Sequence, residues 1–301
     1  MSAPSPTVLP ETCARPGRQA TLAAAFERAG PGLHTGRCAQ VRVSPAAAGA
    51  GILFRRTLKN GCRADVPAHW RYRESQPLCT ALRSADGVLV RTVEHLMAAL
   101  SAHRIDNALV ELDAEELPIF DGSALSWCAG IRQAGRAEQD APRRAVRVLR
   151  PVEVRSGERS LRVEPCDVLR ISAHLALARF PAMDWTGPVD PETFDRDLAP
   201  SRSFGRLKWA VPLKLYSFVT GKPVLRGANL RTTAGILGRR VVGGMSVPDE
   251  PVRHRALDLV GDLALIGHPL LGHVTAVHTG HELNHALVAK LMAEADAWDL
   301  T

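Results

Sequence analysis

Apolar and polar residues alternate along short stretches of the first half of the chain, with the two-residue period of a half-buried β-strand. Residues 38–43 and 51–55 show this period, and the Pro and Gly residues between them predict a hairpin. Apolar residues recur at helical spacing over 92–100, where Thr92 is placed to cap the helix. We expect a buried strand over 107–112 and, after a turn, a second helix over 123–134.

The second half repeats this mixture. Alternation predicts strands over 146–155, 160–164 and 168–179, and helices are expected around residue 254 and from His281 onward. Residues 135–142, GRAEQDAP, are polar and bracketed by Gly and Pro, which is typical of a linker. This pattern indicates an α+β fold with two domains, each a β-sheet layered with about two helices. The expected division is a flexible lead over 1–18, an N-terminal domain over 19–138 and a C-terminal domain over 139–301.

Composition narrows the class of protein. The chain has 301 residues, 46% of them hydrophobic and 23% charged, which is ordinary for a soluble globular protein. The net charge of +7 favours anionic partners, but the absence of a long basic run argues against a nucleic-acid partner. No apolar run approaches a membrane span, and no signal peptide is evident. The six cysteines form no Cys-x-x-Cys pair, so we expect reduced structural thiols and a cytoplasmic protein.

The helix expected around residue 254 carries candidate chemistry. His254, Asp258 and Asp262 recur every four residues, which places their side chains within roughly 80° of arc. A histidine and a carboxylate at this spacing converge on a divalent cation such as zinc, although the same pattern is common on solvated helix faces. His95 can complete a His/His/Asp site, with Glu94 as the general base, or it can be a satisfied core histidine.

Two further clusters are candidates. Residues 278–285 hold three histidines, either as a metal cluster or with His281 as an acid that Asp262 orients and holds protonated. Residues 201–205, SRSFG, place a Ser hydroxyl beside an Arg, which suits an anion or oxyanion but is also typical of a capped turn.

From about Gln19 to the C-terminus, the chain resembles the UDP-3-O-acyl-N-acetylglucosamine deacetylases, the zinc amidases of lipid A synthesis. The resemblance lies in motifs that follow one another in the family's order. They are Gly32-Leu33-His34-Thr35-Gly36, Thr92-Val93-Glu94-His95-Leu96, Ile105-Asp106-Asn107, Pro118-Ile119 with Asp121-Gly122-Ser123-Ala124, Ser201-Arg202-Ser203-Phe204-Gly205, Val252-Arg253-His254 through Asp258, Gly261-Asp262-Leu263, and Gly280-His281 with Leu283-Asn284.

The resemblance implies a role for each matched residue. His95, His254 and Asp258 would be the zinc ligands, and Glu94 the general base. His281 would be the protonated acid, oriented by Asp262, and Ser203 would meet the carbonyl oxygen where the family usually has a threonine. Phe204 would line the substrate site together with Arg255, which replaces the usual lysine. The implied fold has two α+β domains whose helices pack together, with the zinc at their interface.

The chain departs from the family over residues 205–231. This stretch is longer than usual, contains Pro212, and only loosely matches a Gly-Gly-Ser segment near the family's acyl channel. We therefore expect an intact zinc site and an altered acyl passage. The acyl chain length, the choice between zinc and iron, and the oligomeric state stay open, with a monomer as the working expectation.

Three functions are compatible with these patterns. The first is zinc-dependent hydrolysis of the N-acetyl amide of UDP-3-O-acyl-N-acetylglucosamine. The second is a divergent zinc amidohydrolase that acts on another N-acyl sugar nucleotide or another acyl length. The third, which rests on the +7 charge alone, is a non-catalytic protein that binds anions.

Overall fold

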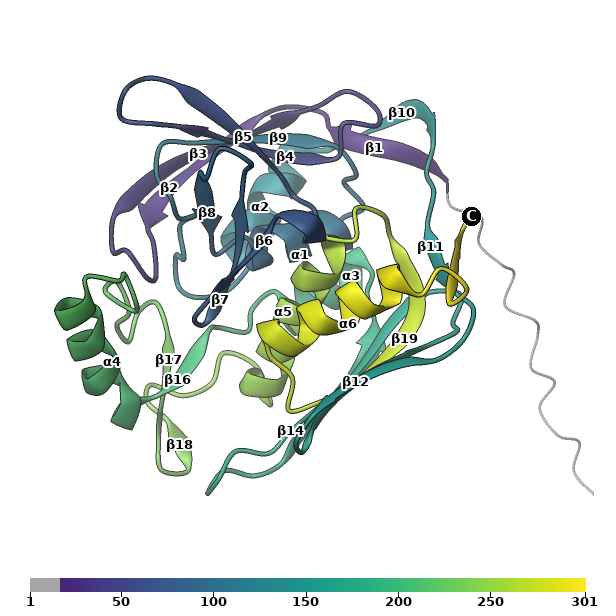
Figure 1. Ribbon diagram of the computed structural model, residues 1–301. Coiled ribbons are helices and arrows are strands. Elements are labelled where there is room, and N and C mark those ends of the chain that lie inside the picture. The colour runs from purple at the N-terminus through teal and green to yellow at the C-terminus, as the bar shows by residue number, and fades with distance from the viewer. Residues whose placement is uncertain (1–16) are drawn as a thin grey trace, which may run out of the picture.

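Five strands of the N-terminal half form a mixed sheet in the order β2-β3-β9-β4-β5 (Figure 1). The computed structural model describes residues 17–301, apart from the side chains of Ala210 and Val211. The strands are β2 (Phe26–Pro31), β3 (Cys38–Pro45), β4 (Ile52–Thr57), β5 (Arg63–Pro67) and β9 (Ala108–Leu112).

Strand β9 lies between β3 and β4, antiparallel to the first and parallel to the second. The predicted hairpin between β3 and β4 is therefore wrong. The strand at 107–112 is confirmed, and its alternate residues Ala108, Val110 and Leu112 are buried. Local turn signals could not reveal that this apolar strand, which comes later in the chain, separates the two earlier ones.

Two helices accompany this sheet, α1 (Glu94–Ala102) and α2 (Leu125–Ala134), which pack against each other. Both predicted helices are thus confirmed, with starts about two residues later than expected. The predicted Thr92 cap is wrong. Thr92 has a positive φ of 57°, and its hydroxyl donates a hydrogen bond to the buried Glu116 carboxylate instead of capping α1.

Two smaller sheets adjoin this half. One contains β6 (Arg73–Gln76), β7 (Cys79–Arg83) and β8 (Leu89–Arg91), and a short helical turn (Trp70–Tyr72) precedes β6. The other pairs β1 (Arg18–Leu22) with β10 (Arg136–Pro142). The irregular structure expected of the linker over 135–142 is therefore wrong, because residues 136–142 form a strand. Its polar residues alternate between exposed and half-buried positions along a two-stranded ribbon, and a polar ribbon of this kind resembles a linker in composition.

A seven-stranded sheet dominates the C-terminal half. Its strands are β11 (Val146–Val148), β12 (Val152–Ser156), β13 (Arg159–Glu164), β14 (Leu169–Leu175), β15 (Met183–Pro188), β19 (Leu270–Val277) and β20 (Trp298–Leu300). The single strand predicted over 146–155 is split in two, with Pro151 in the interruption. Helices α5 (Glu250–Ala264) and α6 (His281–Ala293) pack on this sheet, and both were predicted.

Helix α5 also packs along α1, so one helix from each half of the chain contacts the other at the centre of the molecule (Figure 1). The molecule is a mixed α+β fold, as the pattern predicted. Because α5 is covered by α1 and by the second sheet, its residues from Ala256 to Leu263 are all buried. This burial excludes the alternative that His254, Asp258 and Asp262 belong to a solvated helix face.

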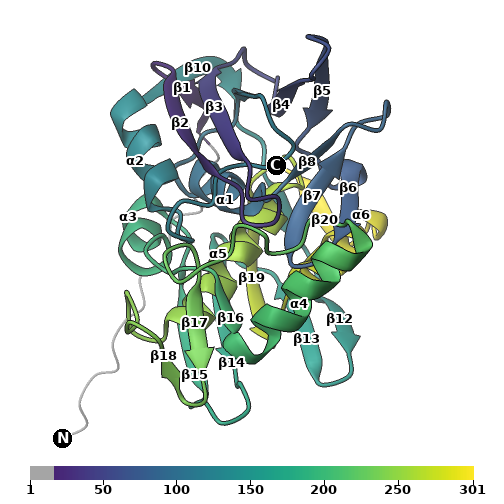
Figure 2. The same cartoon turned by 90° about the vertical axis from the view of Figure 1, so that its left-hand side faces the viewer.

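The remaining elements lie between residues 190 and 241. Helix α3 (Pro191–Thr193) leads into a short π-helical segment (Phe194–Leu198). A small sheet of β16 (Phe204–Arg206), β17 (Ala234–Leu237) and β18 (Arg240–Val241) follows, with α4 (Leu207–Thr220) inserted after β16. Figure 2 shows α4, β17 and β18 at the same end of the molecule.

Residues 1–16 of the predicted flexible lead lie outside the described residues, and β1 already begins at Arg18. Among the described residues, no helix is long and apolar enough to cross a bilayer. The five cysteines of this part are free thiols, in agreement with the expectation of unpaired cysteines.

Candidate active site

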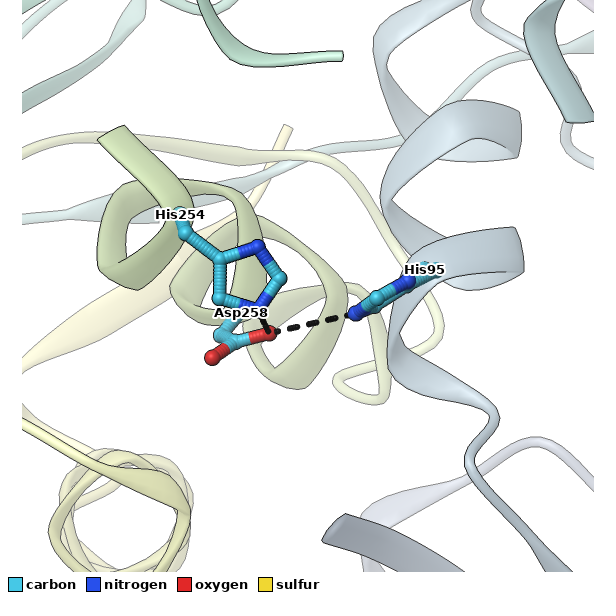
Figure 3. Close-up of side chains that lie close together, drawn as sticks. All are labelled: His95, His254 and Asp258. Atoms are coloured by element: carbon cyan, nitrogen blue, oxygen red, sulfur yellow. Dashed lines mark ion pairs between the residues drawn. The ribbon is translucent and has the colours of Figure 1, made fainter. Parts of the chain in front are cut away.

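Three potential ligand side chains converge where α1 meets α5. His95 comes from α1, and His254 and Asp258 come from successive turns of α5 (Figure 3). One ligand atom from each residue lies within 4.8 Å of those of the other two. Asp258 Oδ1 is 3.6 Å from His95 Nε2 and 3.4 Å from His254 Nε2. All three side chains are buried, so the cluster is not an incidental surface grouping.

The close approach of the two helices depends on Gly261. A Cβ atom at this position would lie 2.1 Å from the carbonyl oxygen of Glu94, a distance that no side chain tolerates. The glycine thus lets the backbone of α5 touch the beginning of α1. Because Gly261 lies one turn beyond Asp258, the same contact fixes the distance between Asp258 and His95.

The ring of His254 is oriented by the backbone. Its Nδ1 lies 3.1 Å from the carbonyl oxygen of Ser201, so Nδ1–H donates to that carbonyl and the Nε2 lone pair stays available to a metal ion. Burial lowers the pKa of His254 to about 4 and keeps the ring neutral. Burial alone would raise the pKa of Asp258, but the imidazoles of His254, His281 and His95 hold it well below its ordinary value. A neutral imidazole beside an ionised carboxylate is the donor set that zinc prefers.

A second group of potential ligands, His103, Cys128 and Asp195, differs in its electrostatics. Asp195 already forms ion pairs with Arg132 and His103. Burial raises the pKa of the Cys128 thiol well above its ordinary value, which opposes formation of the thiolate that binds metals. We therefore assign this group a structural role.

Glu94 lies at the edge of the ligand cluster. It is the first residue of α1, and its carboxylate accepts a hydrogen bond from the backbone N–H of Thr80 over 3.0 Å. Burial raises the pKa of Glu94 to about 7, against the attraction of the His281 and His95 imidazoles. A carboxylate with a pKa near neutrality can both accept and release a proton at neutral pH.

His281 faces Glu94 from the first turn of α6. Its Nε2 is 3.9 Å from Glu94 Oε1, and its Nδ1 is 2.9 Å from Asp262 Oδ2. Burial opposes protonation, but the Asp262 carboxylate outweighs it and raises the pKa of His281 to about 10. Asp262 is itself fully buried and also accepts hydrogen bonds from Asn284 and from the Thr80 hydroxyl. The site therefore presents a base and a protonated acid a few ångströms apart.

These groups open into a cavity of about 1220 Å³ that also contacts Ser203, Phe204 and Arg255. The Phe204 ring packs edge-on against His254, with 6.0 Å between ring centroids, and the Arg255 guanidinium lies 5.0 Å above the same ring. The backbone of Ser203 is held in place, since its N–H donates a hydrogen bond to the carbonyl of Gly122. The cavity walls away from the ligand cluster are mostly apolar, with Leu33, Leu78, Ile119, Leu175, Leu177, Leu207, Leu213, Leu225 and Leu230.

Residues 19–293 match the family model of the UDP-3-O-acyl N-acetylglycosamine deacetylases (LpxC). The chain belongs to this family. Three relatives named UDP-3-O-acyl-N-acetylglucosamine deacetylase cover it almost completely. The protein of Phenylobacterium zucineum is 39% identical over 93% of this chain and 95% of its own length. Those of Myxococcus xanthus and Syntrophotalea carbinolica are 37% and 36% identical over 94% of this chain, and over 88% and 90% of their own.

Two residues of this deacetylase site, Thr80 and His285, were not predicted from the sequence. Thr80 on β7 binds Glu94 with its N–H and Asp262 with its hydroxyl, and so connects these two carboxylates. His285, the last of the three histidines in residues 278–285, places Nε2 3.0 Å from the Thr80 hydroxyl and 3.6 Å from Asp262. Thr80 sits in an ordinary apolar strand, where no local signal marks it. The spacing of His285 one turn after His281 could have indicated a place beside Asp262.

The Gly32–Gly36 motif supports one rim of the cavity. The buried carboxylate of Glu116 accepts hydrogen bonds from the N–H groups of His34 and Thr35. The carbonyls of Leu33 and His34 then accept hydrogen bonds from the backbone of residues 226 and 227. The Gly32–Gly36 motif is therefore bonded to the backbone of residues 226 and 227.

Proposed function

We propose that this protein catalyses zinc-dependent hydrolysis of the N-acetyl amide of UDP-3-O-acyl-N-acetylglucosamine, which releases acetate in lipid A biosynthesis. The observation that carries the proposal is the convergence of His95, His254 and Asp258 beside an acid–base pair in a family of deacetylases. We place the reaction in the cytoplasm and propose the domain division at residues 138/139, with a monomer as the working form.

His95, His254 and Asp258 would hold the metal ion. The set fits because it is buried, contains one anion and two imidazoles, and has His254 oriented by the Ser201 carbonyl. When bound, zinc supplies a Lewis acid and lowers the pKa of a water molecule to about 7.

Glu94 is the base in this proposal. It accepts a proton from the water molecule whose oxygen bonds to the acetyl carbon. The buried setting that raises its pKa to about 7 makes it a stronger base than an exposed carboxylate, and the Thr80 N–H fixes its direction.

His281 is the acid. As the C–N bond breaks, its imidazolium donates a proton to the departing sugar nitrogen, so that acetate and a free amine result. Asp262 positions the ring and maintains its charge, since it binds Nδ1 and leaves Nε2 directed toward Glu94. The Ser203 hydroxyl stabilises the charge on the carbonyl oxygen together with His281.

The cavity supports the assignment of an acyl-bearing anionic substrate. Its apolar walls suit an acyl chain, and Arg255 and Lys214 supply positive charge for a diphosphate. Phe204 would pack against the substrate, and its ring is held in place by Arg255.

A second candidate is a zinc amidohydrolase with another acyl length or another N-acyl sugar nucleotide. It is favoured by one observation: α4 and residues 225–230, which lie within the departure from the family pattern, form part of the cavity wall. A panel of UDP substrates with different acyl lengths separates the two candidates.

The deciding experiment measures zinc content and acetate release on the same purified sample. We expect about one zinc ion per chain and turnover that chelation removes and added zinc restores. Full turnover in a His254→Ala/Asp258→Ala double variant without bound metal would refute the zinc-dependent mechanism. Turnover only with unacylated or non-UDP sugars would refute the substrate.

A further inference from the structure

The segment Ser201–Pro248 has a charge unlike the rest of the chain. It contains nine of the 38 Lys and Arg residues and none of the 31 Asp and Glu residues. The rest of the chain therefore has a net charge of −2, and the whole excess of +7 comes from this segment. Of the nine cations, only Arg202 lies within 4.0 Å of a carboxylate in the part of the chain that the structure describes. The other eight charges are uncompensated.

The same segment concentrates exposed apolar side chains. Among the described residues, fifteen large hydrophobic side chains are exposed, and nine of them lie here. They are Trp209, Leu215, Tyr216, Phe218, Val219, Leu230, Leu237, Val242 and Met245. Phe218 and Val219 are 85% and 74% exposed, the two highest values among these fifteen residues. Apolar side chains exposed together in this way often mark an interaction surface.

Helix α4 directs most of these residues to one side. At about 100° per residue, Trp209, Leu215, Tyr216, Phe218 and Val219 fall within about half of the helix circumference. The opposite side is anchored, since the Ser217 hydroxyl binds the backbone of Lys222 and Val224, and the Lys214 ammonium binds the Ala228 carbonyl.

Exposed cations accompany this apolar surface. Lys208 lies on the outward side of α4, and Lys222 follows its end. Arg239 and Arg240 lie at the turn and in strand β18, beside the exposed Leu237. Figures 1 and 2 show α4 and the β17–β18 hairpin protruding at one end of the molecule. We call the outward side of α4, with this hairpin, the basic apolar face.

We propose that the basic apolar face docks this protein onto the surface of an anionic phospholipid bilayer. Apolar side chains that enter the interface, surrounded by Lys and Arg that meet anionic headgroups, are the combination that holds peripheral proteins on membranes. A second copy of the chain fits poorly, because a symmetric contact would place the same uncompensated cations against one another. The occupant that complements both the charge and the apolar residues is an anionic lipid surface.

Docking in this way would bring the cavity to the membrane. Leu207 and Leu213 of α4 line the cavity wall, Leu215, Phe218 and Val219 of the same helix lie on the docking surface, and Trp209 belongs to both. An acyl-bearing substrate would then enter beside the lipid; this consequence rests on the proposed function, whereas lipid docking does not.

The test is co-sedimentation of the full chain with vesicles of phosphatidylcholine, with and without about 30% phosphatidylglycerol, at low and high salt. We expect about tenfold or greater enrichment on the anionic vesicles, reduced by high salt. Phe218→Ser/Val219→Ser should reduce this binding about tenfold, and Lys222→Glu/Arg240→Glu should reduce it at least as much. The matched control is Leu149→Ser/Val168→Ser, which removes two exposed apolar residues elsewhere and should leave binding unchanged.

Zinc content and circular dichroism of each variant show that folding and the metal cluster are preserved. Absence of binding to anionic vesicles, or binding that the Phe218/Val219 variant retains, would overturn the proposal. Concentration-dependent dimerisation that only this variant abolishes, without vesicle binding, would assign the face to self-association instead. Because vesicle binding needs no turnover, its failure is distinguishable from failure of the deacetylase assay.

Discussion

The α1–α5 contact and the segment Ser201–Pro248 differ in how their polar groups are placed: those of the contact are buried, and those of the segment are mostly exposed. Between the helices, His95, His254 and Asp258 are each 3–4% exposed and have their neighbours within hydrogen-bonding or ion-pair distance. In the segment, cations and apolar side chains face outward, and its anchors are mostly backbone contacts.

The difference indicates that the two regions serve different functions, catalysis and recognition. Chemistry needs groups held to a few tenths of an ångström, which only a packed interface provides. Recognition of a long, variable chain or a fluid surface tolerates looser placement.

The strongest test of the buried region removes Glu94, the proposed base. Glu94→Gln keeps the size and the hydrogen-bond acceptor but cannot take up the proton of water. We expect kcat to fall about 10²- to 10⁴-fold with zinc content unchanged. Steady-state acetate release and metal analysis check this, with the exposed Glu192→Gln as the control. Wild-type kcat in the Glu94 variant would remove it from the reaction.

The acid side is tested by Asp262→Asn. The loss of the anion lowers the pKa of His281, because Asp262 is what raises it against burial. If protonated His281 is needed, the alkaline limb of the pH–rate profile will move to lower pH in this variant. We also expect kcat to fall about 10- to 100-fold. The pH–rate profile measures this shift. Asp195→Asn, which alters the half-buried His103–Asp195 pair away from the site, should leave the profile in place. An unmoved alkaline limb in Asp262→Asn would contradict the assignment.

The contact itself is tested by Gly261→Ala. The added methyl group would meet the Glu94 carbonyl at 2.1 Å, so α5 must move away from α1. We expect a loss of about 1–3 kcal/mol in the free energy of unfolding, together with weaker zinc binding. Denaturant unfolding and zinc titration measure the two effects. Gly205→Ala, whose methyl would meet nothing within 4 Å, is the matched control for stability.

The junction between the two regions is tested by Glu250→Gln. The buried Glu250 carboxylate accepts bonds from the Arg202 guanidinium and backbone and from the Ser246 N–H, and so ties both ends of the segment to α5. We expect a loss of about 1–3 kcal/mol, toward the lower end because the Arg202 side chain is 18% exposed. Urea unfolding measures it, and Glu27→Gln in a surface ion pair should cost less.

The same junction predicts a pH dependence. Burial alone would raise the pKa of Glu250, but the bonds from Arg202 and Ser246 hold it below its ordinary value of 4.5. Its contribution to stability is therefore complete above pH 4.5 and is lost as pH falls through the lower folded-state pKa. The difference in unfolding free energy between wild type and Glu250→Gln should shrink below pH 4.5. A difference that grows on acidification would contradict this sign.

Sequence reasoning succeeded where local spacing carries the information. The helices around residues 94, 254 and 281 were predicted, as was the α+β class. It failed where the outcome depends on distant partners: β9 separates β3 and β4, and residues 136–142 pair with β1 instead of forming an irregular segment. Pairing of this kind has no local signal, because a strand's hydrogen-bonding edge is the same whichever strand it meets.

The candidate site divides in the same way. The sequence by itself determined which residue types recur at ligand spacing, and its motif order identified the family. Only the tertiary structure decided that His95 lies opposite Asp258, that Thr80 connects Glu94 with Asp262, and that His285 lies beside them. The reason is physical: spacing within a helix fixes neighbours on that helix, whereas contacts between helices depend on how closely their backbones approach, here through Gly261.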